Sequence, residues 1–291
     1  MFLKHILDEK NINISHSIRD YVFPEKLTTL TFIENPCTPT QVPLILIIVC
    51  SNVGNIALRQ SIRETWASEA KYYNIHVLFL LGLSKKNSLN VQAIEENLKY
   101  NDLIIENFID SYYNLTIKSL MLLKWVGHNC KSAHYVMKVD DDVYLNMKNL
   151  YKFVVLFINE SKNFLIGKLY TKERPHRNED SKWYIPKFIY PNETYPHFLC
   201  GVGYLMSGDV VLQLYQESFN HKWIFLEDVF LTGICAENIG LERRDHLGFH
   251  FFEHAVDVEC NSIHAHMILL SHHINPKEMS RIHYKISKCN I

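Results

Sequence analysis

The sequence Lys138-Val-Asp-Asp-Asp-Val-Tyr144 sets the carboxylates of Asp140, Asp141 and Asp142 side by side. Residues 133–139 alternate before it, which predicts a strand with the acidic residues at its carboxyl end. In open α/β sheets, ligands bind beyond the carboxyl ends of the strands. Adjacent carboxylates repel one another unless a cation neutralises them, and their hard oxygens suit Mg²⁺ or Mn²⁺. The stretch therefore predicts a divalent-metal site for a phosphorylated substrate, with a solvated acidic turn as the alternative.

The rest of the chain alternates predicted strands and helices, which favours an α/β fold with a mostly parallel central sheet. Short runs rich in Ile, Val and Leu predict buried strands, and helical spacing of apolar residues predicts the helices between them. The predicted strands cover residues 44–50, 76–81, 103–105, 133–139, 163–169 and 200–207. The predicted helices cover residues 84–100, 115–126, 145–158, 209–219 and 234–238, with a last helix after Pro276.

The composition limits the possible functions. The 291 residues are 47% hydrophobic, which supports a sizeable core, and the net charge of −1 argues against a nucleic-acid binder. The apolar run from Val42 to Cys50 contains Pro43 and is shorter than the roughly 20 residues of a membrane span. Charged residues near the N-terminus interrupt any signal-peptide core. We expect residues 1–41 to form a stem or poorly ordered arm, and membrane association only if an N-terminal anchor is missing from this chain.

Two further patterns suggest ligand contacts. Arg59 and Arg63 are four residues apart, so one helix face presents both guanidinium groups, which could clamp a diphosphate. The alternative is that Arg63 pairs with a nearby Glu. Gly201 and Gly203 lie in a predicted strand, where glycines often mark close approach of a ligand or another backbone. The pattern lacks the third glycine and following helix of a dinucleotide fingerprint, which argues against an NAD site.

The cysteines and glycosylation motifs depend on the cellular compartment. No Cys-x-x-Cys pair occurs, which argues against a zinc ribbon, and scattered cysteines fit either free core thiols or long-range disulfides. The seven cysteines are Cys37, Cys50, Cys130, Cys200, Cys235, Cys260 and Cys289. The N-x-S/T sequons begin at Asn13, Asn114, Asn159 and Asn192. They matter only in the secretory pathway, where we expect glycosylation at Asn13, Asn159 and Asn192.

Eight short strings, in order from about Pro43 to Cys289, resemble the β-1,3-glycosyltransferase family. This family includes β-1,3-galactosyltransferases, β-1,3-N-acetylglucosaminyltransferases and, more distantly, Fringe proteins. One such string is weak evidence, whereas eight in the family's order are highly specific. The strings are Arg59-x-x-Ile62-Arg63-x-Thr65-Trp66; Phe79-Leu-Leu-Gly82; Asp110-x-x-Tyr113-Asn114-Leu115-Thr116-x-Lys118; Lys138-x-Asp140-Asp141-Asp142; Trp183-Tyr184 with Tyr190-Pro191; Gly201-x-Gly203-Tyr204; Glu227-Asp228-Val229; and His272 before Pro276-x-Glu278-Met279.

This resemblance implies a GT-A-like catalytic domain over residues 42–291, with the nucleotide-sugar site at the carboxyl ends of the strands. It also implies a UDP-sugar donor, an acceptor glycan on protein or lipid, and an inverting mechanism. Relatives of this kind are usually type II membrane proteins of the Golgi lumen, so we expect that compartment.

The resemblance also assigns roles in catalysis. Asp142, with Asp140 close by, and His272 would hold the metal ion. An imidazole ligand suits Mn²⁺ better than Mg²⁺, so we expect Mn²⁺, with Mg²⁺ possible. Asp228 would act as the general base that activates the acceptor hydroxyl. A pair of acids that simply opens a helix is the alternative for Glu227 and Asp228.

Further residues are expected near the donor and acceptor. Asp140 could also face the ribose, and aromatic faces pack well on sugar rings, although core packing is the alternative for Tyr204. The expected nucleotide contacts are Arg59, Arg63, Asp110, Lys118, Asp140 and Asp141. The expected sugar contacts are Trp183, Tyr184, Gly201, Gly203, Tyr204 and Glu227.

By the same resemblance, we expect disulfides between Cys130 and Cys200 and between Cys260 and Cys289. Galactose is the expected sugar, and N-acetylglucosamine and N-acetylgalactosamine are the alternatives. A metal-dependent phosphatase or nuclease would need further bridging carboxylates or a basic groove, which are not apparent in the sequence. The presence of Asp142, Asp228 and His272 argues against a catalytically silent sugar-binding relative.

Overall fold

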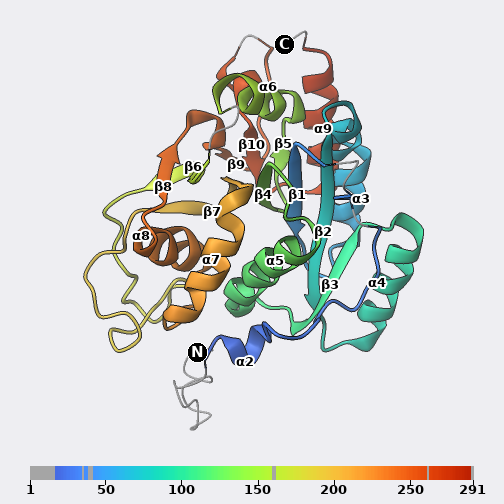
Figure 1. Cartoon of the computed structure of the whole chain (residues 1–291). Helices are drawn as coiled ribbons and strands as arrows, with labels where there is room; N and C mark the ends of the chain where they lie inside the picture. Colours follow the sequence, from blue (N-terminus) through green and yellow to red (C-terminus); the bar gives the residue numbers. More distant parts are fainter. Residues whose placement is uncertain (1–16, 35, 39–41, 159–161, 261, 290–291) are drawn as a thin grey trace.

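A computed structural model describes residues 17–34, 36–38, 42–158, 162–260 and 262–289. At its centre is a seven-stranded sheet with the order β3-β2-β1-β4-β7-β6-β8 (Figure 1). The strands are β1 (Ile45–Cys50), β2 (Ile75–Leu83), β3 (Leu103–Ile109), β4 (Tyr135–Asp140), β6 (Phe164–Tyr170), β7 (Phe198–Ser207) and β8 (Glu242–Asp245). Strand β7 is antiparallel to both of its neighbours, and the other pairings are parallel. The predicted α/β fold with a mostly parallel sheet is confirmed.

Helices cover both faces of this sheet (Figure 1). The α-helices are α2 (Arg19–Val22), α3 (Ile56–Glu64), α4 (Asn87–Tyr100), α5 (Leu115–Asn129), α6 (Met147–Phe157), α7 (Val211–Glu217), α8 (Ala236–Asn238) and α9 (Pro276–Ser287). Short 3₁₀ helices are η1 (Trp66–Tyr72), η2 (Tyr112–Asn114), η3 (Gly208–Val210), η4 (Ser218–Asn220), η6 (Leu247–Phe249) and η7 (Ile263–His266). The segment η5 (Val229–Cys235) is a π-helix, so the helix predicted over 234–238 begins earlier, directly after Asp228.

The strand β1 shows why the sheet is buried on both faces. All of its residues are buried, as expected of a strand in a parallel sheet that is covered on both sides. Leu46 and Ile48 belong to one core with residues of α5 and α7, whereas Ile45 and Ile47 belong to a second core with residues of α6 and α9. Two apolar layers therefore hold the carboxyl end of β4 in place between them.

A small second sheet brings the end of the chain to the acidic stretch. Its order is β5-β10-β9, with β5 (Tyr144–Leu145), β10 (Leu269–His272) and β9 (Phe252–Glu253). Strand β10 pairs antiparallel with β5, which begins two residues after Asp142. The indole of Trp66 donates a hydrogen bond to the carbonyl oxygen of Val143 at 3.1 Å, which fixes the turn between the two sheets. This pairing places His272 next to Asp142.

Part of the expected N-terminal arm belongs to the folded domain. Helix α2 packs on α5, and Ile18 and Val22 are buried in the core. The ammonium group of Lys124 on α5 donates hydrogen bonds to the carbonyl oxygens of Val22 and Phe23, each at 2.9 Å. Residues 17–34 therefore pack against the domain, unlike the poorly ordered arm expected for 1–41, and residues 1–16 lie outside the described residues.

The disulfides correct one expectation and confirm another. Cys130 is bonded to Cys37, with their Cα atoms 5.1 Å apart, so the expected Cys130–Cys200 bond is wrong. Cys130 follows the end of α5, beside the N-terminal segment, whereas Cys200 lies near the start of β7 as a buried free thiol. The expected bond between Cys260 and Cys289 is present, again with a Cα separation of 5.1 Å.

Among the described helices, none is long and apolar enough to cross a bilayer.

The disulfide arrangement makes a direct prediction. Proteolysis without reduction should release a linked peptide pair that contains Cys37 and Cys130, because their sulfurs are joined in the native fold. The Cys37→Ala variant should expose one additional thiol to alkylation under denaturing conditions and should lose about 2–5 kcal/mol of unfolding free energy. Cys200→Ala is the matched control and should keep both disulfides. A peptide pair that links Cys130 to Cys200 would contradict the arrangement.

Candidate active site

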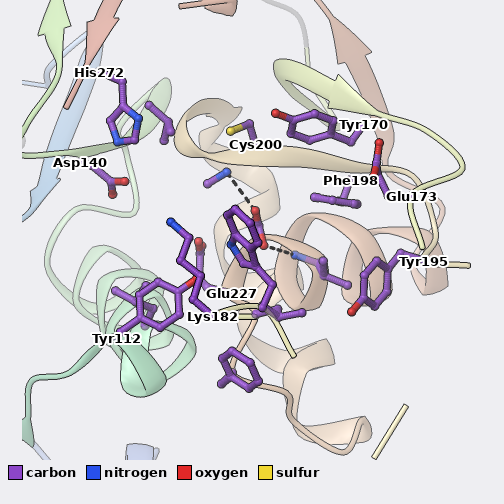
Figure 2. A pocket seen from close by; sticks show the side chains of 18 of the residues that line it. Tyr112, Asp140, Tyr170, Glu173, Lys182, Tyr195, Phe198, Cys200, Glu227 and His272 are labelled. Carbon is purple, nitrogen blue, oxygen red and sulfur yellow. Dashed lines mark hydrogen bonds between the residues drawn. The ribbon is translucent and has the colours of Figure 1, made fainter. Parts of the chain in front are cut away.

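A pocket of about 640 Å³ opens beside the carboxyl end of β4 and the middle of β7. Asp140 and His272 line one end, and Tyr170, Phe198 and Tyr195 lie at the other (Figure 2). Its walls come from the first sheet, from the small second sheet and from the loop between β6 and β7. The pocket therefore joins segments from most of the chain, and such concave sites with few convergent polar groups are typical of ligand binding.

Three side chains form what we call the Asp-His-His cluster: Asp142, His272 and His273. Each offers one ligand atom, and these atoms all lie within 4.8 Å of one another. Nε2 of His272 lies 3.2 Å from Oδ1 of Asp142. Burial alone would raise the pKa of Asp142, but the two histidines outweigh this effect and hold that pKa below its usual value. Asp142 is thus held ionised between two imidazoles.

The cluster fits a divalent metal ion. Oδ1 of Asp142 and Nδ1 of His272 are both buried, and within the described part of the chain neither makes a hydrogen bond of good geometry: Oδ1 has Nε2 of His272 at 3.2 Å, and Nδ1 has Oε2 of Glu253 at 3.7 Å. Buried polar atoms are almost always paired in folded proteins, so such orphans require an explanation. One carboxylate and imidazole nitrogens together make a donor set that a transition metal such as Mn²⁺ accepts. Asp140, expected as another ligand, lies outside this cluster and contacts the ammonium group of Lys138 at 2.7 Å.

The side chain of Lys138 links the two halves of the pocket. It is only 4% exposed, and its ammonium group donates hydrogen bonds to Oδ1 of Asp140 and to the carbonyl oxygen of Gly201. Oε2 of Glu227 lies 3.9 Å away. Burial alone would lower the pKa of Lys138, but Asp140 and Glu227 outweigh it and raise that pKa above its usual value. Lys138 therefore stays charged and connects β4 to β7.

Asp228 is a partly buried carboxylate on the β7 side of Lys138. Its Oδ1 accepts a hydrogen bond from the backbone N–H of Val229 at 2.8 Å, and its Oδ2 accepts one from Gly201 at 3.3 Å. Burial and the neighbouring charge of Glu227 raise the pKa of Asp228 from 3.8 to about 6. A carboxylate tuned in this way can take up a proton close to neutral pH, as a general base must.

Glu227 and Tyr204 form a buried pair behind Asp228. The hydroxyl of Tyr204 donates to Oε1 of Glu227 at 2.7 Å, and Tyr204 is only 2% exposed. Tyr204 does not line the pocket, so its position agrees with core packing rather than with sugar contact. Gly203 serves packing too, because a Cβ there would lie 2.9 Å from a methyl group of Leu269. Gly201 and Glu227, by contrast, line the pocket.

An aromatic group forms the outer wall. Trp183 is 44% exposed and lines the pocket together with Tyr112. The rings of Trp183 and His176 have centroids 5.2 Å apart, and the ammonium of Lys182 lies 4.4 Å above the indole. Tyr184, expected beside Trp183, does not line the pocket, and its hydroxyl points to Glu179.

The two arginines expected to clamp a diphosphate lie outside the pocket lining. Arg59 is completely buried and forms an ion pair with Glu96 at 2.7 Å, while it also donates to the carbonyl oxygen of Asn52. Arg63 pairs with Asp102 at 2.8 Å and with Glu96 at 2.7 Å. Both guanidinium groups are thus engaged by carboxylates, which argues against the clamp and agrees with the ion-pair alternative for Arg63.

Three other expected nucleotide contacts surround the turn after β1. Asp110 and Lys118 form a buried ion pair at 2.6 Å, and Lys118 also donates to the carbonyl oxygen of Ser51. Asp141 points away from Asp142: its carboxylate accepts hydrogen bonds from Ser51 at 2.6 Å and Asn55 at 2.9 Å. These contacts fix the turn after β1, and none of the three residues lines the pocket.

The structure describes two of the four sequon asparagines, Asn114 and Asn192. Asn192 is exposed in the loop before β7, and the side chain of Asn114 donates to the carbonyl oxygen of Ile109. Asn13 and Asn159 lie outside the described residues.

Sequence reasoning missed several residues of the site. It assigned no role to His273, although this residue was visible as the second member of a His-His pair. Oε2 of Glu253 lies 3.7 Å from Nδ1 of His272. The two residues are 19 positions apart in the sequence, so no local pattern predicted that they would meet. Lys138 was visible in the sequence just before the acidic stretch, but its contacts with Gly201 and Glu227 could not be predicted from the local pattern.

Comparisons with known proteins agree with this architecture. Residues 57–246 match the family model described as galactosyltransferase. Beta-1,3-galactosyltransferase 1 of Mus musculus and of Homo sapiens is each 34% identical over 276 residues, which is 94% of this chain and 82% of the relative. Beta-1,3-galactosyltransferase 2 of Homo sapiens is 36% identical over 242 residues, which is 81% of this chain and 57% of the relative.

Two solved structures show weaker likeness. A glycosyltransferase involved in glycosylation of the major capsid of PBCV-1 is 10% identical, with a TM-score of 0.46, over 83% of this chain and 99% of that one. The WbbM bifunctional glycosyltransferase is 10% identical, with a TM-score of 0.44, over 89% of this chain and 51% of that one. The family assignment depends on the sequence matches, which span the sheet, the aromatic wall and Asp228. The chain belongs to the galactosyltransferase family.

Proposed function

We propose that this protein is an inverting β-1,3-galactosyltransferase, which transfers galactose from UDP-galactose to a hydroxyl group of an acceptor glycan on protein or lipid. One observation carries the proposal: the two histidines of the Asp-His-His cluster line the same cavity as Asp140 and as Asp228 with its raised pKa. The names of the relatives support the donor and the linkage.

In this proposal, Asp228 removes the proton from the acceptor hydroxyl as the new glycosidic bond forms. The backbone N–H groups of Val229 and Gly201 orient its two oxygens. Burial and the charge of Glu227 raise the pKa of Asp228, so that this carboxylate can accept a proton near neutral pH, and Tyr204 and Lys138 hold Glu227 in place. Because a single base on the acceptor side is sufficient for direct displacement, this arrangement supports inversion at the anomeric carbon.

Asp142 and His272 would hold the divalent ion, and the support is the approach of Nε2 of His272 to within 3.2 Å of Oδ1 of Asp142 in a group of three possible ligand residues. We propose Mn²⁺, because imidazole nitrogen favours transition metals over Mg²⁺. A bound divalent ion supplies Lewis-acid stabilisation of the negative charge on a departing diphosphate. Asp140, held by Lys138 at the cavity wall, is available to contact the ribose or the ion.

The remaining lining supports two sugar subsites. Trp183 presents a partly exposed indole at the pocket wall, packed beside the ring of His176, and sugar rings stack well on such faces. Gly201 leaves room for the two carboxylates at this wall, since a Cβ there would lie 3.3 Å from Glu227 and 3.4 Å from Asp228. Lys118 and Asp110 would act on the nucleotide indirectly, by fixing the turn that begins at Ser51.

We also propose that the protein works in the Golgi lumen. Disulfides persist in oxidising compartments and are rare in the cytosol, and this fold contains the Cys37–Cys130 and Cys260–Cys289 bonds. The exposed Asn192 in a sequon fits the same compartment.

A donor screen tests the activity. UDP release should be measured with UDP-galactose, UDP-N-acetylglucosamine and UDP-N-acetylgalactosamine against N-acetylglucosamine, galactose and mannose glycosides. We expect acceptor-dependent release to be at least roughly tenfold faster with UDP-galactose, and EDTA to abolish it because the ion is removed. A preference for an N-acetylated donor would replace galactose with that sugar. Binding of UDP-sugars without any transfer would overturn the proposal in favour of a catalytically silent relative.

Replacement of the base tests the mechanism. Asp228→Asn should lower kcat about 10²–10⁴-fold, because a general base contributes that much, while the affinity for UDP measured by calorimetry stays nearly the same. Asp180→Asn, at an exposed position away from the pocket, is the matched control and should keep full activity.

The pH dependence gives a second readout of the same residue. Asp228 acts only when deprotonated, and its pKa is about 6, so kcat/KM should fall tenfold per pH unit below that value and level off above it. UDP and Mn²⁺ binding should be followed over the same pH range, to separate this effect from protonation of His272. An acid limb near pH 4 would show that Asp228 is not the titrating base.

A further inference from the structure

His272 and His273 are neighbours in the chain, yet both imidazole rings lie on the same side of the backbone. In a strand, consecutive side chains point to opposite faces. His272 ends β10, and His273 has a φ of 59°, in the left-handed region. This turn brings the second ring back over the first, with ring centroids 3.7 Å apart and planes inclined by 31°.

Both rings face Asp142 through one nitrogen each. Nε2 of His272 lies 3.2 Å from Oδ1 of Asp142, and Nδ1 of His273 lies 3.2 Å from Oδ2. The two nitrogens thus approach different oxygens of the same carboxylate. A cation between these three side chains would meet two imidazoles and one carboxylate group.

The opposite nitrogens of both rings face one further carboxylate. Oε2 of Glu253 lies 3.7 Å from Nδ1 of His272 and 3.6 Å from Nε2 of His273. Strand pairing sets this position, because Glu253 on β9 is the register partner of His272 on β10. A carboxylate behind a metal-bound histidine fixes the ring orientation and raises the basicity of the ligand nitrogen.

The backbone around His273 is held on both sides. The N–H of Ile274 donates to the carbonyl oxygen of Asp142 at 3.1 Å, and the N–H of His254 donates to that of His272 at 2.8 Å. Left-handed backbone is uncommon at residues other than glycine, although Asn, Asp and His tolerate it better than most, and it persists where the surroundings fix it. The direction of the second imidazole is therefore a built feature of this loop.

We propose that His273 is a third protein ligand of the metal ion, through Nδ1, and that the second imidazole makes the site select Mn²⁺ over Mg²⁺. Glu253 serves both rings as the carboxylate behind the ligands. The inference deepens the proposed function, since it concerns the ion of that same site. Nitrogen ligands favour Mn²⁺ and later transition metals over Mg²⁺, which prefers oxygen.

A matched pair of variants of the full chain tests this inference. His273→Asn removes the imidazole and keeps a residue that tolerates left-handed backbone. His254→Asn is the control, because His254 also has a positive φ, of 64°, and lies nearby with its ring centroid 6.2 Å from that of His273. In calorimetry with UDP present, His273→Asn should weaken Mn²⁺ binding at least about tenfold and Mg²⁺ binding far less. His254→Asn should leave both affinities as in the wild type.

Pulsed electron paramagnetic resonance of the Mn²⁺-loaded protein gives a readout that does not depend on transfer. The wild type should show ¹⁴N couplings from two imidazoles, and His273→Asn should show one. A single imidazole in the wild type, or an unchanged Mn²⁺ to Mg²⁺ ratio in His273→Asn, would overturn the inference. Two imidazole couplings in a protein that transfers no sugar would instead leave the inference standing and remove the proposed activity.

Discussion

The buried ammonium group of Lys138 is the interaction on which the pocket depends. A charge removed from water costs several kcal/mol unless other groups pair with it, and here Asp140, the Gly201 carbonyl and Glu227 surround it. These groups belong to β4, to β7 and to the start of the π-helix. Because one ammonium must satisfy all three, the metal side and the base side cannot shift independently.

This arrangement also explains why the adjacent carboxylates of Glu227 and Asp228 have different surroundings. Glu227 is held by Lys138 and by the hydroxyl of Tyr204, whereas Asp228 has two backbone N–H donors and faces the pocket. Burial, together with the charge on Glu227, therefore raises the pKa of Asp228. A carboxylate whose pKa is shifted by its surroundings in a cleft is typical of active sites. The fold thus keeps Asp228 able to accept a proton near neutral pH, and the cost is repulsion between the carboxylates of Asp228 and Glu227.

The sequence predicted those features that depend on local pattern, and it failed where a contact crosses the fold. The strand before Asp140 and the acids at a helix start follow from periodicity and capping, and the structure has both. Arg59 was read as a ligand because its partner Glu96, 37 residues away, leaves no trace in the local pattern. Cys130 pairs with Cys37 because α2 and its flanking segment fold back on α5, and no spacing rule reveals that.

The π-helix that begins after Asp228 also helps to position this carboxylate beside β7. Its Thr232 accepts a hydrogen bond from the N–H of Leu199 at 2.8 Å and donates one to the carbonyl oxygen of Asp228 at 2.7 Å. One hydroxyl therefore ties the helix both to β7 and to the base. The wider turn of a π-helix is often found at functional sites, and here it lets Asp228 face Gly201 while Thr232 reaches Leu199. An α-helical turn would shift Thr232 relative to β7, so the position of the base depends on this irregular helix as much as on Lys138.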